Sequence, residues 1–246
     1  MDDGKWDSRT ELLLGPEGVR HLSEARVLVV GVGGVGGYAA EILARTGVGR
    51  LTLVDADTVS VSNLNRQLIA TRSSVGRSKT ELFAERFRDI NPEIEVEALE
   101  EFITPENVGD LLDRNFDYVL DCIDTVKPKV ALITECLRRK IPVISSMGAG
   151  GRTDPTKVVY TDIWSTRDDG LARVVRERLR KAGMRHAKLL CVASTEPPRA
   201  GAVIELDMQN KRSSYGTTAT IPALFGIFMG NHVCMSLTTP QKHPSR

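Results

Sequence analysis

Glycines near the start of the chain are spaced as in loops that bind phosphate groups. The pattern G-x-G-x-x-G occupies residues 31–36, and the glycines of this segment are Gly31, Gly33, Gly34 and Gly36. Glycine permits a tight turn and lets phosphates approach backbone N–H groups at the positive end of a helix. Asp55 follows about 20 residues beyond the turn, where an acid can accept hydrogen bonds from ribose hydroxyls. Together these features predict a bound nucleotide, although a glycine loop alone also occurs where a helix and a strand only pack closely.

The residues after Asp55 indicate whether the nucleotide is ATP or a nicotinamide dinucleotide. Polar and cationic side chains follow at Asp57, Asn63, Arg66, Gln67 and Lys79. When a triphosphate loses pyrophosphate, negative charge accumulates on the leaving group, and nearby cations stabilise it. Hydride transfer to a nicotinamide has no comparable need. The pattern therefore favours an ATP-using enzyme over a dehydrogenase, while any one of these charges taken alone could be an ordinary surface residue or a helix cap.

The elements that would position these residues alternate between strand and helix. Apolar runs at residues 27–30, 51–54, 118–121 and 141–144 read as strands, and residues 94–99 alternate like a half-exposed strand. Helical spacing of apolar residues marks segments 38–45, 78–89 and 128–140. We therefore expect an α/β, Rossmann-like fold with a mostly parallel sheet and helices on both faces.

The second part of the chain reads as an extension of this unit. We expect one domain over residues 1–246, with a nucleotide-binding core at about 20–155 and a small C-terminal appendage at about 156–240. Strands are expected at 158–160 and 189–193, a charged helix at 171–181, an exposed polar segment at 209–214, and a loose tail at 241–246. Asp168 and Asp169 are expected at a helix N-terminus, where the helix dipole favours acids.

Composition sets limits on location and partners. The 33 basic and 32 acidic residues leave a net charge of +1, which gives no bulk attraction to nucleic acid. The four cysteines form no C-x-x-C pair, so neither a zinc site nor a disulfide scaffold is expected. The polar, acidic start lacks secretory or transit features, so a cytoplasmic protein is expected. The apolar stretch 219–237 is interrupted by proline and glycines, which favours a buried helix over a membrane span.

These motifs, in this order, resemble those of the ubiquitin-activating-like adenylating enzymes, a family that includes the sulfur-carrier activators MoeB and ThiF. The resemblance implies that the glycine loop and Asp55 hold ATP, and that Asn63, Arg66 and Lys79 contact ribose or phosphates. Asp124 matches the acid associated with Mg²⁺. Arg9 matches an arginine that reaches the phosphates of the partner subunit, so a homodimer is implied. Whether a monovalent cation also binds is left open.

Later segments resemble one branch of that family, the tRNA threonylcarbamoyladenosine dehydratases. The matching segments are residues 86–92, 117–128, 148–155, 194–197 and 215–226. The resemblance implies ATP-dependent adenylation of the carboxylate on the modified adenosine, then ring closure with release of AMP, after the loss of pyrophosphate. tRNA would then be the substrate, and a basic stretch is either a phosphate-binding surface or a solvated helix face; its cations are Arg173, Arg176, Arg178, Arg180, Lys181, Arg185 and Lys188.

One departure from the family and several alternatives stay open. Some relatives carry a cysteine where this chain has residues 211–214, so a cysteine nucleophile there is not supported, and Cys191 and Cys234 read better as buried thiols. The main alternative is an activator of a ubiquitin-like sulfur carrier, which would need an acceptor cysteine. A sulfur-transfer partner, a nucleotide-binding scaffold without turnover, and a nicotinamide oxidoreductase are the remaining alternatives.

Overall fold

A seven-stranded, mostly parallel sheet forms the centre of the molecule. The computed structural model describes residues 4–208 and 211–238. The strand order is β3-β2-β1-β4-β5-β7-β6, and β6 alone runs antiparallel to its neighbour, β7. The strands of this sheet are β1 (Arg26–Val30), β2 (Arg50–Val54), β3 (Glu95–Leu99), β4 (Tyr118–Asp121), β5 (Val143–Ser146), β6 (Val158–Asp162) and β7 (Leu190–Ser194). The chain reverses its direction of travel across the sheet between β1 and β4, which is the place where such folds bind ligands.

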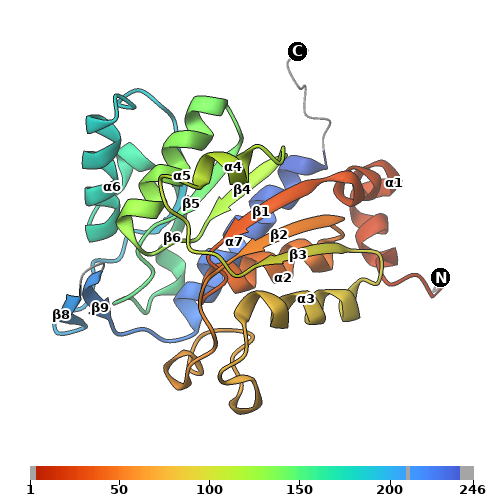
Figure 1. The fold of residues 1–246 in the computed structure, drawn as a ribbon, viewed down its shortest axis with the longest axis horizontal. Coiled ribbons are helices and arrows are strands. Elements are labelled where there is room, and N and C mark those ends of the chain that lie inside the picture. The colour runs from red at the N-terminus through yellow and green to blue at the C-terminus, as the bar shows by residue number, and fades with distance from the viewer. Residues whose placement is uncertain (1–3, 209–210, 239–246) are drawn as a thin grey trace.

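Helices cover both faces of this sheet. They are α1 (Ser8–Glu24), α2 (Gly36–Thr46), α3 (Lys79–Ile90), α4 (Val108–Leu112), α5 (Val126–Arg139), α6 (Gly170–Lys181) and α7 (Thr220–Leu237). Side chains of β1 alternate between the faces: Val27 and Val29 pack with α2, α3 and α7, whereas Leu28 and Val30 pack with α4, α5 and α6. Figure 1 shows α5 and α6 on one side of the sheet and α2 and α3 on the other. The predicted fold class is confirmed.

Helix α7 returns from the C-terminal part of the chain to pack against α2 in the main core. Gly226 and Gly230 face α2, and a side-chain carbon added at Gly226 would lie 2.2 Å from the Val35 carbonyl oxygen. The helix is apolar and long enough, by length and composition alone, to span a membrane, but half of its 18-residue window is buried inside the fold. Its burial against α2 agrees with the expectation of a buried helix.

The remaining predicted elements are found with shifted ends. The strands expected near 158 and 189 are β6 and β7, which extend the same sheet, and the expected charged helix is α6. Asp169 caps α6, since its side chain accepts a hydrogen bond from the Ala172 N–H at 2.9 Å. Part of the segment expected to be polar and exposed is strand β9 (Lys211–Tyr215), paired with β8 (Val203–Met208) in a separate hairpin. Residues 209–210 and the expected tail at 241–246 lie outside the described residues.

Candidate active site

The glycine loop follows β1 and can be built only from glycine at two of its positions. Gly31 has φ +85°, and a side-chain carbon there would lie 3.0 Å from the Cys122 carbonyl oxygen. At Gly36, the first residue of α2, such a carbon would lie 1.8 Å from the Gly31 carbonyl oxygen. The loop therefore turns tightly over β4 and directs the N-terminus of α2 toward the carboxyl edge of the sheet.

Asp55 at the end of β2 is tied to this loop. One of its carboxylate oxygens accepts a hydrogen bond from the Val32 N–H at 2.8 Å, and the other accepts one from the Asp57 N–H at 2.9 Å. Burial raises the pKa of Asp55 above its ordinary value of 3.8, and the nearby charge of Lys79 opposes that rise. The carboxylate is thus held in one orientation beside the loop, as the ribose-binding role requires.

Lys79 brings a buried cation to the same place. It is the first residue of α3, which is capped by Ser78, and its side chain is only 3% exposed. The ammonium lies 2.8 Å from an Asp57 carboxylate oxygen and 3.9 Å from one of Asp55. The three predicted residues Asp55, Asp57 and Lys79 therefore form one cluster at the carboxyl end of β2.

The segment after this cluster lies over the glycine loop. Gln67 is buried, its side-chain nitrogen lies 3.5 Å from a carbon added at Gly33, and its side-chain oxygen is buried with no hydrogen-bond partner in the described residues. Such an orphaned acceptor is costly unless a ligand donates to it. Arg66 packs on the loop at Gly34. Gln67 and Arg66 therefore both lie against the glycine loop.

Asn63 and Arg66 also have local structural partners. The Asn63 side-chain oxygen accepts a hydrogen bond from the Ser60 N–H at 3.0 Å and so closes the short helix Val61–Asn63. The Arg66 guanidinium donates to the Ser62 carbonyl oxygen at 2.8 Å and to the Asn65 side-chain oxygen at 3.0 Å. Both side chains are therefore held in place before any nucleotide is bound, and that of Arg66 packs on the loop.

Asp124 is exposed in the turn between β4 and α5, beside the glycine loop. A fully buried ion pair fixes this turn: the Lys129 ammonium lies 2.8 Å from an Asp121 carboxylate oxygen and donates to the Ile123 carbonyl oxygen at 2.9 Å. Ser145 donates to the same carboxylate at 2.6 Å. Sequence reasoning missed this pair, because a lysine inside a helix gives no sign that it is buried.

Arg9 is not brought together with the other predicted residues. It is exposed near the start of α1, and the far end of α1 leads into β1 at the amino edge of the sheet. Figure 1 shows α1 at the opposite end of the sheet from the β8–β9 hairpin. Any action of Arg9 on phosphates is therefore not at the glycine loop of its own chain.

The C-terminal part of the chain also reaches the site, which the sequence did not reveal. The Asn65 amide donates to the Thr217 carbonyl oxygen at 3.0 Å, and Pro222 lies 3.3 Å from a carbon added at Gly34. Residues from the N-terminal half and from the start of α7 thus share one wall. In the sequence, the prolines and glycines before the apolar helix indicate a loop there, but they do not indicate that this loop reaches the site.

None of the cysteines is placed as a ready nucleophile. Cys136, Cys191 and Cys234 are buried and Cys122 is half-buried. Burial raises the pKa of Cys136 to about 12 and that of Cys234 to about 11, and it raises the pKa of the other two thiols as well. Because the thiolate is the reactive form, these side chains favour structural roles.

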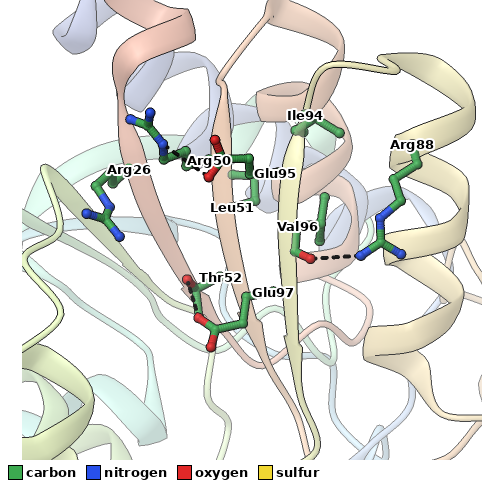
Figure 2. Close-up of a pocket in the computed structure, with 9 residues that line it drawn as sticks. All are labelled: Arg26, Arg50, Leu51, Thr52, Arg88, Ile94, Glu95, Val96 and Glu97. Carbon is green, nitrogen blue, oxygen red and sulfur yellow. Dashed lines mark hydrogen bonds and ion pairs between the residues drawn. The ribbon is translucent and has the colours of Figure 1, made fainter.

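A pocket of about 440 Å³ lies away from the glycine loop, across residues of β1, β2 and β3 near the start of each strand. Figure 2 shows some of its polar side chains paired: Arg50 with Glu95 at 3.3 Å, and Arg88 with the Val96 carbonyl oxygen at 2.9 Å. It lies at the amino edge of parallel strands, opposite the glycine loop. The chemistry-bearing residues therefore do not line it.

Comparison with known proteins agrees with this geometry. A model described as "ThiF family" matches residues 8–245. The tRNA threonylcarbamoyladenosine dehydratase of Bacillus subtilis (strain 168) is 44% identical over 237 residues, covering 94% of this chain and 93% of that protein. The molybdopterin-synthase adenylyltransferase of Salmonella typhimurium (strain LT2) is 41% identical over only 145 residues, or 59% of this chain and 57% of that protein.

Solved structures show the same likeness. The E. coli tRNA N6-threonylcarbamoyladenosine dehydratase, TcdA, in complex with AMP, superposes with a TM-score of 0.85 at 40% identity, covering 94% of this chain and 92% of that one. The same enzyme in complex with ATP gives a TM-score of 0.85 at 39% identity, with coverages of 94% and 93%. The likeness thus extends through the C-terminal part of the chain.

Proposed function

We propose, since the chain belongs to the ThiF family, that it uses ATP to dehydrate and cyclise threonylcarbamoyladenosine in tRNA. A carboxylate is a poor electrophile, and joining it to AMP supplies a good leaving group. The substrate carboxylate oxygen attacks the α-phosphorus of ATP, and pyrophosphate leaves with the electron pair of the broken bond. A carbamoyl atom of the same substituent then attacks the activated carbonyl carbon, loses a proton, and expels AMP. The net change to the RNA is the loss of one water.

The buried ammonium of Lys79 beside Asp55, at the carboxyl end of β2, is the observation that carries this proposal. Asp55 is oriented to accept from ribose hydroxyls, and Lys79 and Arg66 supply positive charge where phosphates would enter. An acyl-adenylate route uses such charge as the leaving pyrophosphate develops. A nicotinamide oxidoreductase breaks no bond to phosphorus and so has no leaving pyrophosphate to stabilise. The relatives named for this reaction match this chain over nearly its whole length.

Asp124 is proposed to help hold Mg²⁺ with ATP. Within residues 4–208 and 211–238, no group of three or more His, Cys, Asp or Glu side chains is placed to hold a metal ion. The single carboxylate of Asp124 is a ligand of the kind that magnesium uses, since this ion commonly binds through one or two carboxylates, substrate phosphates and waters. When bound, the ion would neutralise phosphate charge. The expectation of a monovalent cation stays a prediction.

Helix α6 is proposed to contact tRNA phosphates. Among the residues described, no carboxylate lies within ion-pair distance of Arg173 or Arg180, and Glu177 pairs with Lys181 instead. Burial, and next the charges of Arg180 and Arg167, lower the pKa of Arg176. Uncompensated arginines crowded on one face of a helix favour a polyanion over bare solvent. The cytoplasm, where we place the protein, would supply such an RNA.

A homodimer is proposed from α1. Leu12 and Leu13 are each 82% exposed on the same helix as Arg9, and Trp6 nearby is 43% exposed. Adjacent exposed apolar side chains mark a surface that another protein covers. If a second copy covers it, Arg9 would enter the partner's site, as the resemblance implies.

The alternative, activation of a ubiquitin-like sulfur carrier, gains no specific support. It would need a reactive acceptor thiol, and the pKa of every cysteine is raised by burial. A sulfur-transfer partner remains a prediction.

The proposed function is tested by incubating the protein with Mg²⁺, ATP and tRNA bearing threonylcarbamoyladenosine. Mass spectrometry of the nucleoside and chromatography of AMP should show the loss of one water per AMP formed. The same tRNA with unmodified adenosine is the control and should give no AMP. AMP formation only with a ubiquitin-like carrier protein would overturn the proposal in favour of the alternative.

A further inference from the structure

A small cavity of about 190 Å³ lies between the turn at Gly151 and the segment that precedes α7, and none of the roles assigned above uses it. Its lining includes Gly151, Arg152, Arg199, Thr217 and Thr218. We call it the side cavity. Its volume is well below the ~300–1,000 Å³ of pockets that enclose a whole drug-sized ligand. The side cavity can therefore take one substituent of a substrate, not a complete nucleoside.

A closed circuit of backbone hydrogen bonds frames the side cavity. The Gly151 N–H donates to the Gly216 carbonyl at 2.8 Å, and the Gly216 N–H donates to the Ala202 carbonyl at 2.8 Å. The Ala202 N–H donates to the Arg199 carbonyl at 3.1 Å, and the Arg199 N–H returns to the Gly151 carbonyl at 2.8 Å. Each segment of the frame holds the next one. The side cavity is thus preorganised before a ligand enters, which lowers the cost of binding.

The side cavity shares a wall with the proposed adenylation site. The Asn65 amide donates to the Thr217 carbonyl oxygen at 3.0 Å, and Asn65 precedes Arg66, which packs on the loop at Gly34. Pro222, a few residues after the Thr217–Thr218 wall, lies 3.3 Å from a carbon added at Gly34. A group seated in the side cavity is therefore linked to the glycine loop through the Asn65–Arg66 segment.

The two arginines of the side cavity differ in what they already bind. The Arg152 guanidinium is buried and donates to the Glu196 carbonyl at 2.8 Å, to the Asp168 carbonyl at 2.9 Å, and to the Gly148 carbonyl. It also lies 3.6 Å from the Asp169 carboxylate. In contrast, the Arg199 guanidinium is exposed and forms no ion pair or side-chain hydrogen bond within the described residues. Arg199 is therefore the cation that is available to an incoming anion.

We propose that the side cavity holds the acyl substituent of the substrate nucleoside and that Arg199 pairs with its carboxylate. The inference rests on the proposed function, which requires a carboxylate to meet the α-phosphate. A guanidinium binds a carboxylate through two parallel hydrogen bonds, which fixes its direction as well as its place. With the carboxylate held next to the loop, the attack on phosphorus becomes a reaction between positioned groups. Arg199 is thus a substrate-binding residue for the first step.

The inference is tested with Arg199→Ala and two RNAs, one tRNA bearing threonylcarbamoyladenosine and the same tRNA with unmodified adenosine. Loss of a charge-assisted hydrogen bond should reduce kcat/KM for AMP formation on the order of 10- to 100-fold. The affinity for ATP alone and the affinity for the unmodified tRNA should stay at the wild-type level. Arg199→Lys should recover part of the lost activity. Arg138→Ala, which removes an exposed arginine of α5, is the matched control and should leave every value unchanged.

Two results would overturn the inference while leaving the proposed function intact. One is a wild-type kcat/KM in Arg199→Ala. The other is an equal loss of affinity for both RNAs, which would make Arg199 a contact to a flanking phosphate. If the unsubstituted protein forms no AMP with the modified tRNA, the proposed function itself fails, and the inference falls with it.

Discussion

Lys79 is a nearly buried cation held between two aspartates. Its ammonium is 2.8 Å from Asp57, whose side chain is 73% exposed, so one side of the cluster is open to an entering ligand. A buried charge is tolerated only when it is paired, and in this cluster one of the paired acids, Asp55, also accepts a hydrogen bond from the glycine loop. The same ammonium can therefore stabilise the empty site and serve the phosphates of ATP.

Lys79→Ala should reduce kcat for AMP formation by about 10²–10³-fold, the scale of losing one preorganised stabiliser of transition-state charge. The substitution also leaves Asp55 and Asp57 without their cation, so a lower thermal midpoint is expected. Arg77→Ala is the control, because Arg77 forms only an exposed ion pair with Glu85. AMP formation at the wild-type rate in Lys79→Ala would contradict the assignment.

Asp55 predicts how nucleoside binding depends on pH. Burial raises the pKa of this carboxyl above 3.8, so protonation on acidification begins at a higher pH than for an exposed aspartate. The protonated carboxyl accepts hydrogen bonds less well from ribose hydroxyls and from the Val32 N–H. The affinity for adenosine, which carries no titrating phosphate, should therefore fall as the pH falls through the pKa of Asp55. Calorimetric titrations with adenosine across this pH range should show weak binding with little pH dependence in Asp55→Asn. If the affinity of that variant falls with pH as steeply as that of the wild type, Asp55 does not bind the ribose.

At the scale of whole helices, the contact between α2 and α7 depends on two glycines of α7. Both helices approach so closely that a carbon at Gly226 would meet the Val35 carbonyl oxygen at 2.2 Å, and a carbon at Gly230 would lie 2.8 Å from the Ile42 Cβ. Backbone atoms cannot rotate away as the end of a side chain can. The helices must therefore separate if either glycine gains a methyl group.

Gly226→Ala should lower the free energy of unfolding by about 1–3 kcal/mol, the usual cost of forcing extra volume into a packed core. Nucleotide affinity should weaken as well, since α2 begins at the glycine loop. Urea unfolding measures the first effect and calorimetry the second. Met235→Ala on the exposed side of α7 is the control, with little change expected. Unchanged stability in Gly226→Ala would show that the helix contact is looser than described.

The elements that the sequence predicted well are those whose signal is local. An apolar run, a glycine turn and helical periodicity lie within residues 26–54, and they give β1, α2 and β2 with ends shifted by one or two residues. Helix α1 was not predicted from the sequence, because Gly15 and Pro16 interrupt its helical pattern, and the helix is kinked at Gly15. The hairpin β8–β9 was missed because its second strand is polar, without an apolar face to mark it.

In the site, too, the residues that could be predicted are those marked by a local sequence pattern. Asp55, Lys79 and the glycines follow one another in a known order, so their meeting was predictable. The arrival of Thr217 and Pro222 was not, since it depends on where α7 docks, and nothing local specifies that contact. The burial of Lys129 against Asp121 likewise depends on the helix–sheet packing of the complete fold.

The separation between Arg9 and the glycine loop gives a test of the whole assembly. In a two-fold symmetric dimer, each site would combine Lys79 of one chain with Arg9 of the other. Arg9→Ala and Lys79→Ala should each form AMP far more slowly than the wild type when assayed alone. Mixing them should restore activity, because half of the dimers would be mixed and each would keep one intact site, giving roughly a quarter of the wild-type rate.

Subunit exchange should be verified by native mass spectrometry before the rates of AMP formation are compared. A mixture of Arg9→Ala with Arg9→Ala,Lys79→Ala is the matched control, in which every site lacks Arg9 and no recovery is possible. Failure to recover activity in a mixture that has exchanged subunits would show that Arg9 does not act between chains.

The packing of α7 on α2 also affects when the protein can fold during its synthesis. α2 and its glycine loop leave the ribosome early, yet the helix that covers them is the last of the described helices to be synthesised. Chains elongate at about 5–20 residues per second and begin to fold before they are complete. During that interval the apolar side of α2 is open to chaperones and to other nascent chains. Nucleotide binding should therefore begin only near the end of synthesis, which keeps incomplete chains from consuming ATP.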